Sequence, residues 1–449
     1  MTRSDIVVIG GSAAGLTAAI TARRRHPDRS VLVIRKERQV LIPCGIPYIF
    51  GTVGAPEKNL IADAVLEKNG VDLLLAEATD IDRERKMVHT TAGDVEYERL
   101  VLATGSRPIM LPIAGADLDG VYAIVKDVEY LRGLQVRLET AHNVVVVGGG
   151  FIGVEFADEI NKLGGKHVTV VEVAPHCLSL AYDEEFCVEM EKVIASRGIA
   201  IRTSAKVAAI EGQGRVERVV LAGGDAIEAD VVIMGVGAVA SVDLAKKAGI
   251  RMGLTGGIAV DRTMRTSDES IFACGDCAEK MSFFGGRPSP LKLASIATFE
   301  ARIAGANLFG IQRENVGTVG VWSTALGGTA LATAGMTEAM ARDRGYEVAA
   351  ATVEGPNRHP GGMPGAVNTR VKLVFETHSG VILGGQVMGD PTAGEVINAV
   401  SACVQKKMTA EDMAMFQVGT HPALTASPVA YHVVNAAEMA IQQMRRQGA

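Results

Sequence analysis

The sequence has few cysteines and no long apolar run, and each absence excludes a class of protein. Six cysteines at irregular spacings among 449 residues do not make the framework of a disulfide-rich secreted protein. Apolar runs such as residues 143–147 end at glycine or charged residues, well short of the ~20 residues that span a bilayer. We therefore expect reduced thiols and no membrane segment, so that any important cysteine is catalytic.

We expect neither a signal peptide nor a nucleic-acid-binding surface from this sequence. Its first five residues lead straight into the strand-like Ile6-Val7-Val8-Ile9, without the apolar core and cleavage site of a secretory signal. The net charge is −6, the pI is about 5.9, and the basic residues are mostly dispersed. We predict a cytoplasmic protein with neither a nucleic-acid partner nor a membrane partner.

What the chain does contain is one supersecondary unit that occurs twice. Residues 5–10 form a β run ending in Gly10-Gly11-Ser12-Ala13-Ala14-Gly15, and a helix and a second strand (residues 30–34) follow. The same order of strand, glycine turn, helix and strand recurs over residues 143–172. Because 449 residues exceed a single core, we expect an α/β protein of two or three domains, two of them Rossmann-like dinucleotide-binding domains.

Shorter motifs follow these two units. Residues 100–105, 230–237 and 271–276 each contain an apolar strand that ends at a glycine turn. Beyond residue 320 the sequence becomes richer in Gly, Ala and Thr, and the strand-like residues 371–375 and 381–388 precede helical stretches. This change of texture predicts a third, C-terminal α+β domain.

The second glycine turn is the more complete of the two. A glycine turn between a parallel strand and a helix brings backbone N–H groups and the helix N-terminus against a pyrophosphate. Gly148 to Gly153 has the full Gly-x-Gly-x-x-Gly pattern, and Glu172 lies 19 residues after Gly153. A carboxylate there accepts hydrogen bonds from both ribose hydroxyls and repels a 2′-phosphate, and the adjacent Val173-Ala174-Pro175 offers no arginine. The second turn predicts NADH in preference to NADPH.

The first turn departs from the pattern in two places. Ser12 replaces the middle glycine, and Arg35 stands where an acidic residue is expected, with Glu37 as the alternative carboxylate. One glycine pattern alone is often only a tight turn. Two of them in βαβ context, together with a Gly275-Asp276 element, make two bound dinucleotides the better interpretation.

A cysteine follows the second strand of the first unit. Cys44 lies in Leu41-Ile42-Pro43-Cys44-Gly45-Ile46-Pro47-Tyr48, where the ligands of doubly wound sheets collect. A thiolate beside a redox cofactor and near a helix N-terminus has a depressed pKa and attacks disulfides, persulfides or peroxides. The alternative interpretation is a small buried hydrophobic residue.

With these motifs the chain resembles the pyridine nucleotide-disulfide oxidoreductases. Within that family it is similar to the single-cysteine branch of coenzyme A disulfide reductases, NADH oxidases, NADH peroxidases and persulfide reductases. Pro43 to Tyr48 carries this resemblance, which extends over residues 103–108, 148–155 and Cys274-Gly275-Asp276 and covers about residues 1–310. It implies bound FAD and NADH, a Cys44 that cycles between thiolate and mixed disulfide or sulfenic acid, and an Asp276 that holds the FAD ribitol.

The resemblance also implies the division of the chain. It places an FAD-binding domain in residues 1–115 and 256–325, an NAD(P)H-binding domain in residues 116–255, and a C-terminal dimerisation domain in residues 326–449. We expect a homodimer in which the C-terminal domain completes the partner's active site. The expected cofactor-binding residues lie in the turns and at the strand ends: Gly10, Ser12, Ala14, Gly15, Arg35, Glu37, Pro43, Ala103, Thr104, Gly105, Gly148, Gly150, Ile152, Gly153, Glu172, Gly237, Gly275 and Asp276.

Two departures from the branch bear on the substrate. NADH oxidases and peroxidases similar to this chain place a histidine in the first glycine turn, and Ala13 stands there instead, which favours sulfur chemistry. Coenzyme A disulfide reductases usually have paired tyrosines after a C-terminal histidine, whereas His359 is followed by Pro-Gly-Gly-Met. The substrate therefore stays open among coenzyme A disulfide, persulfide, polysulfide and another small disulfide.

A second candidate catalytic residue lies near the C-terminus. His421, in Thr420-His421-Pro422, looks like the histidine that acts as acid–base catalyst from the dimer mate in the glutathione reductase branch. Ala426 replaces the glutamate that normally orients it, so a structural role is the alternative. Cys274 and Cys277 form a Cys-x-x-Cys pair that we interpret as incidental, and we predict no metal site, because zinc needs four ligands.

These observations predict an FAD-dependent NADH oxidoreductase that reduces a small disulfide, persulfide or polysulfide, coenzyme A-linked or not, through Cys44. One alternative is an NADH oxidase that reduces oxygen to water or peroxide. The other is an electron-transfer flavoprotein reductase that serves a protein partner, as rubredoxin reductases do.

Overall fold

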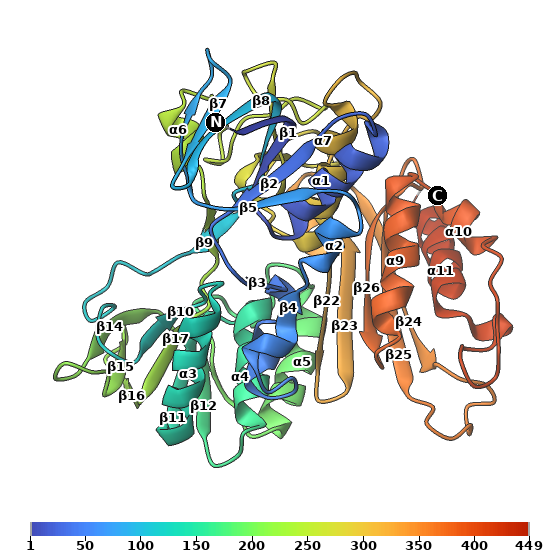
Figure 1. Cartoon of the computed structure of the whole chain (residues 1–449). Coiled ribbons are helices and arrows are strands. Elements are labelled where there is room, and N and C mark those ends of the chain that lie inside the picture. Colours follow the sequence, from blue (N-terminus) through green and yellow to red (C-terminus); the bar gives the residue numbers. More distant parts are fainter. Residues whose placement is uncertain (1, 448–449) are drawn as a thin grey trace. The chain divides into compact units, whose positions relative to one another are not determined.

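The computed structural model describes residues 2–447. The first glycine turn follows strand β1, which belongs to a mostly parallel seven-stranded sheet (Figure 1). The strand order is β5-β2-β1-β8-β7-β6, and β19 also pairs with β8. The second half of β8 pairs in parallel with β19, whereas its first half pairs antiparallel with β7. The strands are β1 (Thr2–Ile9), β2 (Val31–Arg35), β5 (Asp72–Leu75), β6 (Ala78–Asp82), β7 (Met87–Thr90), β8 (Gly93–Leu102) and β19 (Ile271–Ala273).

One helix packs against this sheet, and a second helix packs closely against the first. They are α1 (Ala13–Arg25) and α7 (Ala294–Asn307), and small residues line their contact. A Cβ on Gly305 of α7 would lie only 2.5 Å from the carbonyl oxygen of Ala18 in α1, so only glycine allows this approach. The buried Val and Ile side chains of β1 and β2 fill the core below, as expected for parallel strands covered on both faces.

Short elements complete this first unit. β9 pairs antiparallel with β18, β10 pairs in parallel with β17, and β3 pairs antiparallel with β4. Their bounds are β3 (Val40–Leu41), β4 (Leu60–Ile61), β9 (Ser106–Pro108), β10 (Val121–Ala123), β17 (Val231–Met234), β18 (Ala238–Ala240), β20 (Lys280–Met281), β21 (Pro288–Ser289), α2 (Ala64–Glu67), α3 (Val128–Thr140), α6 (Asp243–Lys247), and the 3₁₀ turns η1 (Pro43–Gly45), η2 (Pro47–Phe50), η3 (Pro56–Asn59) and η4 (Gly275–Cys277).

The second glycine turn lies in a second βαβ unit. β11 (Asn143–Val147), β12 (His167–Val171) and β13 (Ala200–Arg202) run parallel, and α4 (Phe151–Asn161) connects the first two. α5 (Glu184–Ser196) connects the second pair of strands. An antiparallel three-stranded sheet follows, formed by β14 (Val207–Glu211), β15 (Arg218–Leu221) and β16 (Ala226–Glu228).

The C-terminal region is an antiparallel five-stranded sheet of order β22-β23-β26-β25-β24 with helices packed on it (Figure 1). α9 packs on β23 and β26, and α11 packs on β24 and β25. The elements are β22 (Val321–Leu326), β23 (Thr329–Gly335), α8 (Glu338–Asp343), β24 (Val348–Pro356), β25 (Asn368–Glu376), β26 (Ile382–Gly389), α9 (Ala393–Gln405), α10 (Ala410–Ala414), η5 (Pro428–Ala430) and α11 (His432–Gln447).

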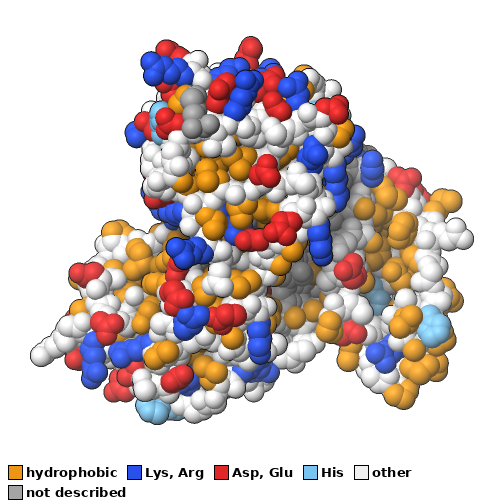
Figure 2. Space-filling model, viewed as in Figure 1, with side chains coloured by type: hydrophobic (Ala, Val, Ile, Leu, Met, Phe, Trp, Pro, Cys, Tyr) orange, Lys and Arg blue, Asp and Glu red, His pale blue; other side chains and the backbone are white. Residues whose placement is uncertain are grey.

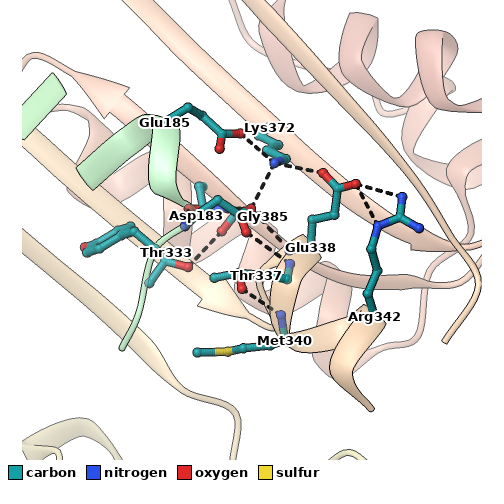
Figure 3. Close-up of polar contacts among 12 residues, drawn as sticks. Asp183, Glu185, Thr333, Thr337, Glu338, Met340, Arg342, Lys372 and Gly385 are labelled. Carbon is teal, nitrogen blue, oxygen red and sulfur yellow. Dashed lines mark hydrogen bonds and ion pairs between the residues drawn. The ribbon is translucent and has the colours of Figure 1, made fainter. Parts of the chain in front are cut away.

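A buried charge network joins this sheet to the start of α5 (Figure 3). The ammonium group of Lys372 on β25 lies 3.0 Å from Asp183, 2.6 Å from Glu185 and 2.9 Å from Glu338. Asp183 also accepts hydrogen bonds from the amides of Glu338 and Ala339 and from the side chain of Gln386. Lys372 is 7% exposed, so one buried cation holds three carboxylates together.

The chain divides into two compact units, which we describe separately. The first comprises residues 1–142, 212–216 and 230–318, and the second comprises residues 143–211, 217–229 and 319–449. No helix among residues 2–447 is long and apolar enough to cross a membrane. The predicted fold class, an α/β protein with two Rossmann-like sheets and a C-terminal α+β region, is confirmed.

Candidate active site

The first glycine turn is shaped by close backbone contacts. Gly10 has a φ of +119°, and a Cβ on it would collide with the carbonyl oxygen of Ala103. A Cβ on Gly15 would collide with the carbonyl oxygen of Gly10. Ser12 occupies the N-cap position of α1, but within the described chain its side chain accepts no hydrogen bond from the helix. The turn therefore leaves the first amides of α1 available to an anion.

Two further loops meet this turn. A Cβ on Gly275, whose φ is +75°, would lie 2.7 Å from the side chain of Ala14, so the Gly-Asp element lies directly against the turn. Asp276 accepts a hydrogen bond of 2.7 Å from Ser106, which follows the Ala103-Thr104-Gly105 segment. The hydroxyl of Thr104 donates to the carbonyl oxygen of Ser241 at 2.6 Å. Three segments distant in the sequence thus converge at the carboxyl edge of the sheet.

A buried ion pair lies beneath the Gly-Asp element and was not expected from the sequence. Glu300 of α7 accepts hydrogen bonds from the amide of Gly275 (2.9 Å) and from Lys280 (3.0 Å). Lys280 also donates to the carbonyl oxygens of Gly275 and Ala278. Burial raises the pKa of Glu300 to about 7, and Lys280 opposes that shift. The pair holds both polar groups of the Gly275 backbone.

Arg35 is buried at the end of β2, and its side chain lies against Gly11 of the first turn. Its guanidinium group donates to the carbonyl oxygens of Glu37 and Arg38 and lies 2.7 Å from Asp63. The side chain of Glu37 is exposed. Asp63 therefore brings a carboxylate to this strand end, although it lies 28 residues further along the chain than Arg35 and no sequence signal marks it.

Cys44 is exposed in the turn η1, one residue after Pro43. Asn59, which is buried, fastens this turn: its side-chain amide donates to the carbonyl oxygen of Ile42 at 2.9 Å, and its own carbonyl oxygen accepts from the amide of Ile42. A Cβ on Gly45 would collide with the side chain of Asn59. The thiol is thus presented on a fixed loop.

The other five cysteines are buried, and the pKa of each thiol is raised. The first cause in every case is burial, which disfavours the thiolate, and the residues are Cys177, Cys187, Cys274, Cys277 and Cys403. Cys277 Sγ contacts the carbonyl oxygens of Leu102 and Cys274. These thiols have the features of structural residues rather than reactive ones.

The second glycine turn repeats the geometry of the first. Gly148 has a φ of +106°, and a Cβ on Gly153 would collide with its carbonyl oxygen. Gly150 caps α4 without a side chain, and an added Cβ there meets no described atom within 4 Å. The side chain of Ile152 is 39% exposed beside the turn. The N-terminus of α4 is accordingly open to a ligand.

Glu172 lies directly beneath this turn. One carboxylate oxygen accepts from the amide of Gly149 at 2.5 Å, and the other accepts from the amide of Ala174 at 2.7 Å. These two bonds fix the orientation of the carboxylate, which has lone pairs left for ribose hydroxyls. Gly237, in the other unit, has a φ of +99° and accepts from the amide of Ile109, so its observed role is in a turn.

Glu155, in the second turn of α4, is an unexpected titratable group near the loop. Burial raises its pKa to about 7, whereas the hydroxyl of Thr324, which donates to it at 2.8 Å, opposes the shift. The glycine pattern says nothing about this residue, because its environment depends on a strand almost 170 residues away.

His421 lies on an exposed loop of the C-terminal region. Its Nδ1 accepts from the amide of Ala423 at 3.2 Å, which leaves Nε2 to carry the proton of the neutral imidazole. The loop of His359 lies beside it, because the amide of His359 donates to the carbonyl oxygen of Pro422 and its ring contacts that of Thr425.

Comparison with known proteins defines the class. The chain matches the pyridine nucleotide-disulphide oxidoreductase family over residues 4–301 and the dimerisation domain of the same family over residues 323–431. The chain belongs to this family and is an FAD-dependent NAD(P)H oxidoreductase.

Three proteins that are similar to the chain have named activities. The chain is 31% identical over 418 residues to an NAD(P)H coenzyme A polysulfide/persulfide reductase of Pyrococcus horikoshii, covering 91% of this chain and 93% of that protein. It is 31% identical over 424 residues to an NADH oxidase of Methanocaldococcus jannaschii, covering 91% and 92%. A solved NAD-dependent persulfide reductase from A. fulgidus matches with a TM-score of 0.91 and 32% identity, over 99% of this chain and 84% of that chain.

The residues present fit the cofactors of this family. In each glycine turn, a Cβ on the last glycine would collide with the carbonyl oxygen of the first glycine. The helix that follows each glycine turn has no acidic residue in its first helical turn. Both features suit a pyrophosphate.

Proposed function

We propose that the enzyme uses NADH to reduce a small persulfide, polysulfide or disulfide, with a coenzyme A-linked substrate as the first candidate, through Cys44. One observation carries the proposal. Among the six cysteines, all within the described residues, Cys44 alone is exposed, and it lies in the same unit as the first glycine turn. A nucleophilic thiol must reach its substrate, and the five others are buried with raised pKa values.

In this proposal the Cys44 thiolate attacks the sulfur–sulfur bond of the substrate. One sulfur leaves as a thiolate or hydrosulfide, and the other stays bonded to Cys44. Two electrons then cleave this new sulfur–sulfur bond, which releases the second sulfur as a thiolate or hydrosulfide and restores the Cys44 thiolate. Bound FAD supplies the path for two electrons between the nicotinamide and this sulfur. Asn59 holds the Cys44 turn in place, and His421 of the second subunit is the candidate proton donor to the leaving sulfur.

The chain's own residues bind the two dinucleotides in this account. The amides after Gly10, Ser12 and Ala14 hold the FAD pyrophosphate, and Asp276, oriented by Ser106, binds the ribitol. Arg35 acts indirectly, by holding Asp63 at the ribose end of the site. The other proposed cofactor-binding residues of this unit are Gly15, Glu37, Pro43, Ala103, Thr104, Gly105, Gly237 and Gly275.

NADH is the preferred nicotinamide cofactor in the proposal. Gly148, Gly150, Ile152 and Gly153 form the pyrophosphate turn, and Glu172 accepts from the ribose hydroxyls. A fixed carboxylate repels a 2′-phosphate, because it cannot turn away.

A homodimer belongs to the same proposal. Hydrophobic side chains gather on the surface of the C-terminal region (Figure 2). Met415, Leu424 and Val429 are 83%, 70% and 87% exposed; Leu424 lies in the His421 loop and Val429 in the turn η5 that follows it. A second copy of the chain that covers these side chains would place His421 against the partner. We propose the same domain limits as above, with residues 326–449 as the dimerising part.

An NADH oxidase is the second candidate, because one relative at 31% identity bears that name. Ala13, the first residue of α1, argues against an NADH oxidase, because its methyl group cannot act as an acid or base in oxygen chemistry.

The Cys44→Ser variant tests the proposal. We expect anaerobic NADH to reduce its flavin at the wild-type rate, whereas reduction of coenzyme A persulfide and coenzyme A disulfide falls at least about 1,000-fold, because the attacking thiolate is absent. Cys403→Ser, a buried thiol, is the matched control. Full sulfur reductase activity in Cys44→Ser would refute the proposal.

A further inference from the structure

The edge strand of the C-terminal sheet lies along the helix that follows the second glycine turn. Two side chains of β22 contact two of α4. The rings of Trp322 and Phe151 are parallel, with an interplanar angle of 7° and centroids 6.1 Å apart. Two residues further on, the hydroxyl of Thr324 donates to the carboxylate of Glu155 at 2.8 Å.

The spacing of these two contacts follows from the two secondary structures. Trp322 and Thr324 are two residues apart, so they lie on one face of the strand, about 6.7 Å apart along it. Phe151 and Glu155 are four residues apart, so they lie on one face of the helix, about 6 Å apart along it. The spacing of the two side chains along the strand therefore matches the spacing of their two partners along the helix.

The first two turns of α4 are therefore held from one side by a different sheet. The Phe151 ring also contacts Tyr182, whose hydroxyl donates to the carbonyl oxygen of Leu331 on the neighbouring strand β23. Thr324 is buried, so its hydrogen bond to Glu155 is shielded from water. Glu159 and Tyr182 are the other titratable groups that act on Glu155.

We propose that Trp322 and Thr324 are positioning residues of the nicotinamide nucleotide site. They fix the first two turns of α4, whose N-terminal amides bind the pyrophosphate, although neither residue belongs to the dinucleotide-binding fold itself. This inference rests on the proposed binding of NADH at the turn from Gly148 to Gly153. Its physical reason is preorganisation: a helix N-terminus that is already oriented loses less freedom when the nucleotide binds.

Trp322 also provides the readout, because it is the only tryptophan in the chain. We titrate the FAD-loaded enzyme with NAD⁺, so that no hydride is transferred. The change in Trp322 fluorescence then measures the affinity of the enzyme for NAD⁺. Thr324→Val removes the hydroxyl but keeps the shape, and we expect the Kd for NAD⁺ to rise about three- to tenfold. Thr324→Ser keeps the hydroxyl and should stay within about twofold of wild type.

Ser323→Val is the matched control, since Ser323 is exposed on the opposite face of the same strand. A Thr324→Val enzyme that binds NAD⁺ as tightly as Ser323→Val would overturn the inference. If wild type itself fails to bind NAD⁺, the proposed nucleotide site is wrong, and the inference falls with it. The two failures are distinguishable because only the second affects the unmodified enzyme.

A second pair of variants covers the case in which Thr324→Val unfolds the region. Trp322→Leu removes the stacking partner of Phe151, and Trp322→Phe keeps a ring there. We expect Trp322→Leu to raise the KM for NADH at least about threefold with kcat within about twofold, and Trp322→Phe to restore most of the loss. Equal KM values for both variants and wild type would contradict a positioning role.

Discussion

Glu172 shows how one side chain acquires a function from its backbone surroundings. One carboxylate oxygen accepts from the amide of Gly149 in the glycine turn and the other from the amide of Ala174 in the loop after β12, so the charge stays at one point beneath the turn. Its position could be predicted from its distance to the glycine pattern, but these two bonds could not, because they depend on how the turn and the loop after β12 fold against each other.

The first prediction concerns cofactor preference. Glu172→Gln keeps the shape but removes the charge that repels a 2′-phosphate, so the ratio of kcat/KM for NADH over NADPH should fall at least about tenfold. Steady-state kinetics with both cofactors measures it. Glu189→Gln, a change on the exposed side of α5, should leave the ratio unchanged. An unchanged ratio in Glu172→Gln would mean that this carboxylate does not select the cofactor.

The second prediction concerns pH. Burial raises the pKa of Glu155 to about 7 in the folded chain, above its ordinary value of 4.5. A carboxyl group with a raised folded pKa is stabilised in its neutral form, so its contribution to stability is present below pH 4.5 and is lost as the pH rises toward 7. Glu155→Gln stays neutral throughout. Thermal unfolding of the two proteins should therefore show the variant gaining about 1–3 kcal/mol relative to wild type between pH 5 and pH 8. A pH-independent difference would contradict the raised pKa.

At the scale of elements, the two strand–turn–helix units could be predicted almost completely. Residues 143–147 form β11 as expected, and the first helix begins at Ala13, within the expected glycine turn of residues 10–15. The period and the glycines are local signals, and local signals survive without tertiary information. The contacts of Asn59, Asp63 and Thr324 could not be predicted, because each joins segments that only the fold brings together.

The third prediction separates the two turns. In Gly15→Ala a Cβ meets the carbonyl oxygen of Gly10, and in Gly153→Ala it meets that of Gly148. Gly15→Ala should lose FAD during purification, whereas Gly153→Ala should keep FAD but lose most of its reduction by NADH. Flavin absorbance before and after anaerobic NADH measures both.

Gly133→Ala on α3 is the control for this pair. A Cβ there meets no described atom within 4 Å, and alanine favours a helix by roughly 0.5–1 kcal/mol over glycine. The control should keep both cofactors. A Gly15→Ala protein with full FAD content would show that the first turn does not bind the pyrophosphate.

At the scale of the whole molecule, the proposed active site requires two copies of the chain. The fourth prediction is that Val429→Asp weakens the dimer, because it places a charge among exposed apolar side chains that the partner would cover. Light scattering after size exclusion should show monomers at micromolar concentration. Leu254→Asp is the control, since Leu254 is 90% exposed but lies in the other unit. A wild-type monomer would remove His421 from the proposed site.

The central claim is that electrons from NADH leave the enzyme through Cys44 to a sulfur substrate. The most direct test reduces the purified enzyme anaerobically with NADH and mixes it rapidly with coenzyme A persulfide, coenzyme A disulfide, polysulfide or oxygenated buffer while the flavin spectrum is recorded. We expect one sulfur substrate to reoxidise the flavin at least about 100-fold faster than oxygen does at equal concentration. Reoxidation by oxygen alone would contradict it and make the protein an NADH oxidase.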